Sequence, residues 1–497
     1  MPSILTDLNP IIPIINLFVA ITSLCVAIIF FLIPLINSIC IIRKEIDRSL
    51  SDGIKYHLNN KIEEARNEYN KALKYQNKKF CKRLIIDVKL NLYETYHHEK
   101  IDKEKNLDIA RINEEALLKA LPNYKDKKYL KLTKYKYKYQ YAILCCNLGD
   151  IYNELALIRS AKNNYENSKK YSSKAIDVFR NIKKLDKNYF GTVGLTYSNL
   201  AITYRGLANL KKDISLLQIS LNNAEKSLTI YEEIKDYFNI ARIQNNIGNI
   251  YSDLVKYKED INEREKNYIN SENYLYKSLE FYKIENYPYE SARSYQNLGS
   301  VNLHMMYYCD DKNKAYSYFI KAKENYEICK SVIIKDKYEN EYINLYYNLM
   351  SLNFQALKKF GDIQLIPNVV DYGNFVLEIC TIENNPKRYV DTNGIIASVC
   401  KIAIECCEFI DENEKIDMIE DAINRFEIVL RFKELSMQKK ANTIIDLIRL
   451  NMTLLDMTKS KVYEVKCNSY CKELEDIIKV NPEVMIEIED MFFNNVE

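Results

Sequence analysis

The stretch Asn147–Tyr152 reads Asn-Leu-Gly-Asp-Ile-Tyr, and its outline returns at Asn199–Tyr204 and Asn246–Tyr251. Weaker copies begin with the same residue type, which gives six copies starting at Asn91, Asn147, Asn199, Asn246, Asn297 and Asn348. From 91 through 147, 199, 246 and 297 to 348, the steps are 56, 52, 47, 51 and 51 residues. A period near fifty with helical patterning predicts a repeat array and not a single globular core.

A second pattern precedes these copies. Small and aromatic residues lie at offsets 0, 3, 12, 16, 19 and 20, namely Gly53, Tyr56, Ala65, Tyr69, Ala72 and Leu73. Small residues let two antiparallel helices approach, and tyrosines fill the gaps beside them. The pattern resembles the tetratricopeptide repeat (TPR), including long-repeat arrays such as those of kinesin light chains. The resemblance implies an all-α, right-handed α-solenoid of TPR-like hairpins over residues 43–435, followed by capping helices over 436–497.

The repeat spacing also predicts long helices. Between matching small residues, the later units exceed the 19-residue spacing of Gly53 and Ala72 by 7, 7, 11 and 4 residues. These excesses match whole helical turns, which keep an apolar stripe on one face. For the unit of Gly149, Ala161, Tyr165 and Ser168 also fit without any insertion, so that alignment stays open.

The alternating run Lys134–Tyr141 is typical of a strand or of a basic, aromatic patch for single-stranded nucleic acid. It continues into the helix of Asn147–Tyr152 with no breaker between them. We therefore favour the outer turns of a long helix.

Composition agrees with a stack of helices. Glycine (10) and proline (9) are scarce among 497 residues, tyrosine is abundant (41) and tryptophan is absent. The formal net charge of +3 argues against a polyanion-binding protein as a whole. The thirteen cysteines form no CxxC pattern. We expect reduced, buried thiols, as in a reducing compartment.

The N-terminal region predicts a membrane anchor. No charged residue lies between Leu8 and Ile42, a stretch of 35 positions. After a short segment, 1–13, residues 14–42 are expected to form one transmembrane helix, with a buried core helix as the alternative. Asp7 is the only charged residue before the run, and the basic residues Arg43, Lys44 and Arg48 follow it. This bias predicts an N-terminus outside and a cytoplasmic array.

The sequence contains no nucleotide-binding loop, nucleophile elbow or metalloprotease motif. We expect no enzyme activity, no cofactor and no metal site.

The asparagine that starts each repeat phrase carries the functional prediction. The TPR resemblance implies that this position faces a concave groove, where an amide can donate to and accept from a peptide backbone. Arg242 and Arg293 stand four residues before Asn246 and Asn297, and they would meet acidic side chains. The predicted partner-binding residues are Asn91, Asn147, Asn199, Asn246, Asn297, Asn348, Arg242 and Arg293. The alternative is that these asparagines cap or hydrate local backbone.

These features predict a membrane-anchored scaffold or receptor that binds an extended peptide or protein, with a preference for acidic segments. Alternatives are a sensor or adaptor in a bacterial stress or phage-defence system, and a structural tether with no groove ligand. The prediction of a nucleic-acid binder would rest only on the Lys134–Tyr141 run. The sequence decides neither the partner nor the oligomeric state.

Overall fold

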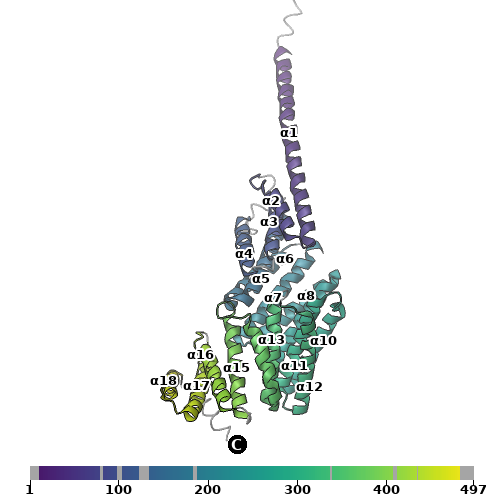
Figure 1. Cartoon of the computed structure of the whole chain (residues 1–497). Coiled ribbons are helices and arrows are strands. Elements are labelled where there is room, and N and C mark those ends of the chain that lie inside the picture. Colours follow the sequence, from purple (N-terminus) through teal and green to yellow (C-terminus); the bar gives the residue numbers. More distant parts are fainter. Residues whose placement is uncertain are drawn as a thin grey trace, which may run out of the picture. The chain divides into compact units, whose positions relative to one another are not determined.

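The computed structural model describes residues 11–78, 82–97, 103–121, 134–182, 187–335, 339–406, 411–433 and 435–481, with side chains from Leu35 onward. The regular elements in these ranges are helices, which confirms the all-α class (Figure 1). The chain divides into two compact units, Met1–Asp236 and Tyr237–Glu497. Each unit is described here by itself, and the single array expected over 43–435 stays a prediction.

Unit 1 is a series of helical hairpins, because each even-numbered helix packs on the helix before it. Its helices are α1 (Ile11–Leu58), α2 (Ile62–Leu73), α3 (Lys82–His97), α4 (Lys103–Ala120), α5 (Lys134–Ile158), α6 (Ala161–Arg180), α7 (Phe190–Lys211) and α8 (Ile214–Ile234), with a 3-10 turn, η3 (Lys187–Tyr189), before α7.

Unit 2 repeats the same pairing. Its helices are α9 (Tyr237–Tyr257), α10 (Ile261–Phe281), α11 (Pro288–Tyr308), α12 (Lys312–Val332), α13 (Glu339–Phe360), α14 (Ile366–Leu377), α15 (Pro386–Cys406), α16 (Glu412–Leu430), α17 (Met437–Thr458) and α18 (Lys461–Val480), with a 3-10 turn, η4 (Ile363–Leu365), before α14. The odd-numbered helix α11 also contacts α9 and α13. In unit 1, α5 likewise contacts α3 and α7. We call the odd-numbered helices the inner helices.

In several hairpins, an aspartate caps the N-terminus of the second helix. The carboxylate of Asp213 accepts from the backbone N–H of Ser215 at the start of α8. Asp260 does the same for Glu263 at α10, and Asp311 for Asn313 at α12. Such a cap satisfies a backbone donor that has no partner within the helix. Short connections with a capping residue thus fix where each hairpin turns.

Small residues lie where the two helices of a hairpin cross. A Cβ atom added to Gly53 would lie 2.3 Å from a ring carbon of Tyr69, and one added to Gly299 would lie 2.4 Å from a ring carbon of Tyr326. The tyrosine ring therefore occupies the space that a larger residue would need. This packing confirms the TPR-like interpretation of the Gly53 pattern.

Serine hydroxyls mark the same crossing in three successive hairpins. Ser168 donates to the carbonyl of Gly149 at 2.7 Å, and Ser271 donates to that of Gly248 at 2.8 Å. Ser220 makes the equivalent bond to Ala201 at 2.7 Å. Gly149 therefore crosses α6 at Ser168 and Ser172, since an added Cβ on Gly149 would lie against the Ser172 hydroxyl. This favours the alignment without an insertion, and the bonds of Ser220 and Ser271 likewise give shorter spacings, of 19 and 23 residues, than the expected 26 and 30.

The prediction of long helices is confirmed. Helices α5 to α12 each span 20–25 residues, whereas α2 spans 12. The added turns lie at the open end of the hairpin: Ala175 and Phe179, late in α6, pack with Tyr139 and Ala142 near the start of α5. The Lys-Tyr run belongs to this added length because α5 begins at Lys134. The helical interpretation of that run is confirmed.

Other boundaries differ from expectation. Residues 42 and 43 do not separate two elements, because α1 is continuous from Ile11 to Leu58 and its last turns pack on α2. The two closing helices expected after residue 436 are α17 and α18, which form a further hairpin. The third one expected, over 482–493, lies outside the described residues.

Within the residues searched, none of the helices is both long enough and apolar enough to cross a membrane. Most of the predicted span, 14–42, falls before Leu35, where side chains are outside the described part of the chain. The predicted right-handed superhelix stays a prediction, because the two units are described separately.

Candidate partner-binding surface

The inner helices of unit 2 carry the predicted arginines and three of the predicted asparagines. Arg242 and Asn246 lie on α9, Arg293 and Asn297 lie on α11, and Asn348 lies on α13. Neighbouring helices in contact have axes about 8–10 Å apart. Because α11 contacts both α9 and α13, equivalent positions on these helices are close neighbours.

Arg242 has an unusual environment. Its side chain is half-buried, and its Nε atom is buried without a hydrogen-bond partner. It forms no ion pair with any residue that the structure describes. The nearby hydroxyl of Tyr282 donates to the carbonyl of Phe238 at 2.9 Å. Burial raises the pKa of Tyr282 and the charge of Arg242 opposes that rise, so the guanidinium faces a neutral aromatic neighbour.

Arg293 is exposed, and its guanidinium carbon lies 5.9 Å from the centre of the Tyr289 ring. It has no ion-pair partner among the described residues. The Tyr289 hydroxyl donates to Glu341 on α13. Both predicted arginines therefore keep their charge available to a partner.

The asparagines of unit 2 fall into two kinds. Asn246 and Asn348 are half-buried, and their amides make no hydrogen bond within the described part of the chain. Asn297 instead donates to Oδ1 of Asn245 at 2.7 Å, and Asn245 donates to the Ser294 hydroxyl at 2.5 Å. Asn245 therefore has a structural role. The sequence did not predict this role, because the repeat pattern gives no signal for Asn245 beyond its position beside Asn246.

Unit 1 places its asparagines differently. Asn199 is 1% exposed and donates to the carbonyl of Cys146 on α5 at 3.2 Å. The expectation that Asn199 faces an open groove is wrong, because α5 and α7 enclose it. Asn147 donates to Glu114 at 3.4 Å, and Asn91 donates to the carbonyl of Asp87 in its own helix at 2.8 Å. Local bonding by Asn91 is what the alternative interpretation predicts.

The two units also differ four residues before each asparagine. In unit 1 these positions hold Asp87, Ile143 and Leu195, where unit 2 has Arg242 and Arg293. The cationic inner surface is therefore a property of unit 2. We define the candidate surface by five residues: Arg242, Asn246, Arg293, Asn297 and Asn348.

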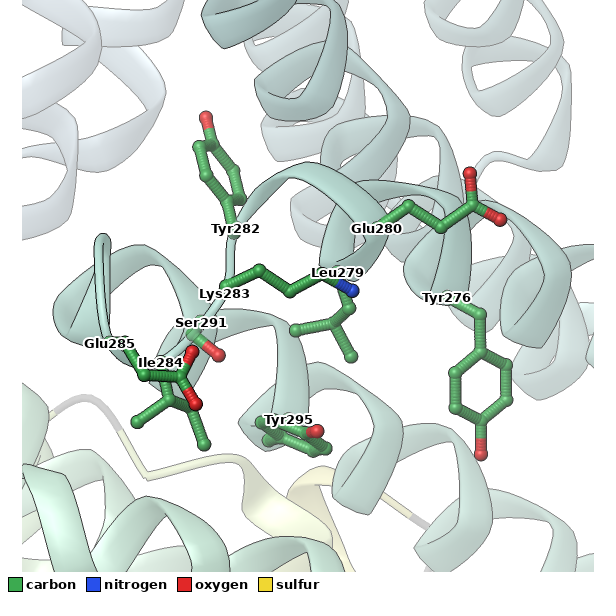
Figure 2. Close-up of a pocket in the computed structure, with 9 residues that line it drawn as sticks. All are labelled: Tyr276, Leu279, Glu280, Tyr282, Lys283, Ile284, Glu285, Ser291 and Tyr295. Carbon is green, nitrogen blue, oxygen red and sulfur yellow. The ribbon is translucent and has the colours of Figure 1, made fainter.

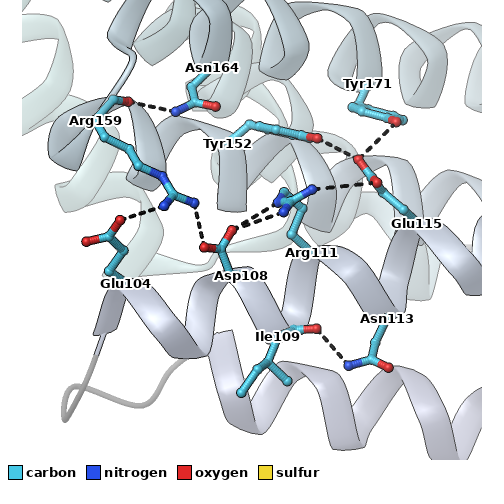
Figure 3. Close-up of polar contacts among 10 residues, drawn as sticks. All are labelled: Glu104, Asp108, Ile109, Arg111, Asn113, Glu115, Tyr152, Arg159, Asn164 and Tyr171. Atoms are coloured by element: carbon cyan, nitrogen blue, oxygen red, sulfur yellow. Dashed lines mark hydrogen bonds and ion pairs between the residues drawn. The ribbon is translucent and has the colours of Figure 1, made fainter.

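A charged network in unit 1 was not predicted from the sequence. Arg159 contacts Glu104 at 2.7 Å and Asp108 at 2.5 Å, and Arg111 bonds the second oxygen of Asp108 at 3.1 Å (Figure 3). Arg111 also lies 3.8 Å from Glu115, which accepts from Tyr152. These contacts join α4 to the α5–α6 hairpin. Since each charge has an opposite partner, we assign the network to stability.

Buried thiols are confirmed for most of the described cysteines, whereas Cys40, Cys406 and Cys471 are exposed. Burial raises the pKa of Cys145 to about 12 and that of Cys146 to about 12, so both thiols stay protonated at neutral pH. Among the described residues, no group of three His, Cys, Asp or Glu side chains is arranged to hold a metal ion.

Paired helices with contacts between inner helices define a repeat protein built from TPR-like hairpins. No protein-family model matches the chain, and no curated protein matches it.

Solved structures include similar chains. One is a Rap protein complexed with Competence and Sporulation Factor, with 13% identity over 89% of this chain and 99% of that chain and a TM-score of 0.41. Another is the apo form of the quorum sensor NprR from B. thuringiensis, with 14% identity over 88% of this chain and 99% of that chain and a TM-score of 0.44. A circular tandem repeat protein has 14% identity over 90% of this chain and 97% of that chain and a TM-score of 0.26. The hairpin class follows from the packing within this chain's own repeats.

Proposed function

We propose that this protein is a membrane-anchored scaffold that binds an acidic segment of a peptide or protein on the candidate surface of unit 2. The observation that supports binding most directly is the buried Nε atom of Arg242, which has no hydrogen-bond partner. A buried donor without a partner costs about 1–3 kcal/mol, and more for a charged group. A carboxylate from a partner can bind the accessible part of the same guanidinium with charge-assisted bonds, which offsets this cost.

The spacing of the two arginines suggests the form of the ligand. Arg242 and Arg293 stand at equivalent positions on helices in contact, whose axes are about 8–10 Å apart. A peptide in the polyproline II conformation rises about 3.1 Å per residue with three residues per turn, so two side chains three residues apart lie on one face and match this separation. The side-chain amides of Asn246 and Asn348, which make no hydrogen bond within the described part of the chain, would form hydrogen bonds with the peptide backbone. The preferred segment therefore carries two acidic residues about three positions apart.

Membrane anchorage is the second part of the proposal. It is supported by the 35 uncharged positions from Leu8 to Ile42, because about 20 apolar residues in a helix span the hydrocarbon core. The basic residues that follow favour a cytoplasmic array. The binding surface would then face partners inside the cell.

The binding test uses the full chain purified in detergent and fluorescent peptides that carry two aspartates three residues apart in a Gly-Ser background. The variants Arg242→Gln and Arg293→Gln should each weaken binding about tenfold or more, since a bond to a charged group contributes about 1.5–3 kcal/mol. The loss should shrink at high salt, where ionic attraction is screened. Lys277→Gln, an equal change of charge on the outer helix α10, is the matched control.

Wild-type affinity in Arg242→Gln would place the partner elsewhere on the molecule. Parallel affinity purification of wild type and Arg242→Gln from solubilised membranes then identifies the natural partner by its loss from the variant.

A further inference from the structure

A pocket of about 380 Å³ lies where α10 ends and α11 begins, within unit 2 (Figure 2). Its apolar lining comes from Leu279, Ile284 and the ring of Tyr295. Lys283 reaches across the pocket beside Leu279, and the carboxylates of Glu280 and Glu285 complete its charged lining. The volume is at the lower end of the range for small-molecule sites, about 300–1,000 Å³.

The hydroxyl of Ser291 is a buried polar group in the lining of this pocket. Ser291 lines the pocket, is 1% exposed, and its Oγ atom has no hydrogen-bond partner. Ser294, buried one turn later on α11, is fully bonded: its hydroxyl lies 2.5 Å from the Asn245 amide, 3.0 Å from the Ser278 hydroxyl and 3.2 Å from the Glu290 carbonyl. Buried polar groups in native proteins are normally paired. Ser294 is hydrogen-bonded and Ser291 is not, so the Ser291 hydroxyl lacks a hydrogen-bond partner that a ligand could supply.

The charges of the lining are also unpaired. Lys283, Glu280 and Glu285 are exposed and form no ion pair with residues in the described ranges. A ligand carboxylate can accept from the Lys283 ammonium and, once rotation about the Cα–Cβ bond turns its buried Oγ toward the pocket, from the Ser291 hydroxyl. A ligand ammonium can meet Glu280 or Glu285.

We infer that this pocket binds a carboxylate joined to an apolar group, as in a free apolar α-amino acid or the C-terminal residue of a peptide. The apolar group packs on Leu279, Ile284 and Tyr295, and the carboxylate bonds Lys283 and Ser291. The pocket adjoins the candidate surface of unit 2, because Tyr282 lines it and is a neighbour of Arg242. The residues assigned here to the ligand are not those of that surface, and the inference does not depend on peptide binding there.

Calorimetric titration of the full chain tests the inference with L-leucine, L-phenylalanine and a short peptide ending in leucine. Binding of a free amino acid would identify the natural ligand as a metabolite. Binding of the peptide alone would identify it as the C-terminus of a polypeptide chain. Leucinamide and the C-terminally amidated peptide lack the carboxylate and should not bind. Equal binding of the amides, or no binding of any carboxylate probe, overturns the inference.

Two serine variants separate recognition from folding. Ser291→Ala should weaken carboxylate binding about tenfold while the melting temperature stays the same or rises, because the variant removes an unpaired buried hydroxyl. Ser294→Ala should lower the melting temperature, because its hydroxyl is bonded. Lys283→Gln should weaken binding without a change in melting temperature. Wild-type affinity in Ser291→Ala, or a melting temperature lowered as far as in Ser294→Ala, contradicts the assignment.

Discussion

The side-chain amide of Asn297 donates a 2.7 Å hydrogen bond to Oδ1 of Asn245, and this bond joins the inner helices α11 and α9. Asn245 in turn donates to the hydroxyl of Ser294 on α11. One asparagine of the repeat phrase therefore holds two repeats together while Asn246, next to Asn245, stays unbonded. Recurrence of a residue type along a repeat array does not give every copy the same role.

Asparagine variants should separate these roles. Asn199→Ala should lower the free energy of unfolding by about 1–3 kcal/mol, because it removes a buried hydrogen bond between α7 and α5 and the packing of a side chain that is 1% exposed. Asn246→Ala should change the free energy of unfolding by less than about 0.5 kcal/mol, as expected for a residue without bonded partners. Urea denaturation of the two variants measures both values. An equal loss in the two variants would show that Asn246 is structural.

The glycine at the α11–α12 crossing should be intolerant of a methyl group. A Cβ atom on Gly299 would lie within 2.4–2.7 Å of three ring atoms of Tyr326, a fully buried residue. Gly299→Ala should therefore cost about 1–3 kcal/mol of stability from overpacking. Gly191→Ala on α7 is the matched control, because no atom lies within 4 Å of its added Cβ. Thermal unfolding should show a lower melting temperature for the first variant only.

The charged network of unit 1 should make stability depend on pH. Burial alone would raise the pKa of Asp108, but hydrogen bonds from Arg159 and Arg111 outweigh it and lower the pKa below its usual value. The unfolded chain then binds protons first, near the ordinary Asp pKa of about 3.9. The stabilisation is therefore complete at neutral pH and is lost as the pH falls through the folded pKa.

Asp108→Asn measures this contribution. The variant should be less stable than wild type by about 1 kcal/mol at pH 7, a modest value because the network is partly exposed to solvent. The difference should shrink as the pH falls below about 3.9, because the unfolded wild-type chain then binds protons that the folded Asp108 carboxylate does not. Denaturant midpoints at pH 7, 5 and 3 give the comparison, and a gap that does not change with pH would argue against the ionic origin.

The anchor predicted over residues 14–42 has a topological test. Protease added to sealed right-side-out cells should leave the helical array intact, because the basic residues after Ile42 favour a cytoplasmic array. Detergent should then expose it to cleavage. Digestion of the array before detergent is added would reverse the predicted orientation, and recovery of the chain in the soluble fraction would exclude the anchor.

Sequence spacing predicted the hairpins well because the two helices of a hairpin are adjacent in the chain. Gly53 and Tyr69 lie 16 residues apart, and helical geometry fixes how they face each other. The whole-turn excesses likewise predicted longer helices, since added turns must keep the apolar face inward. The crossing partners were less predictable, because serine replaces alanine there. Only the bonds of Ser168, Ser220 and Ser271 identify the true spacings of 19, 19 and 23 residues.

The candidate site was less predictable because burial depends on neighbours from other repeats. Asn199 and Asn246 begin the same phrase, yet Asn199 lies beneath α5 whereas Asn246 is half-buried. No spacing rule distinguishes them. The buried Nε of Arg242, the unpaired hydroxyl of Ser291 and the division after Asp236 also arise from packing between distant residues.

The continuous helix α1 has a mechanical consequence. Its 48 residues correspond to about 72 Å of unbroken helix, and its C-terminal part is fixed to the first hairpin through Ile46, Ala65 and Tyr69. A helix advances about 100° per residue, so one residue inserted between Cys40 and Ile46 would rotate the whole N-terminal half by that angle. Inserting seven residues, about two turns, would nearly restore the original phase. No glycine or proline lies between Pro34 and Ile46, so torsion applied to that part of α1 reaches the first repeat without a hinge to absorb it.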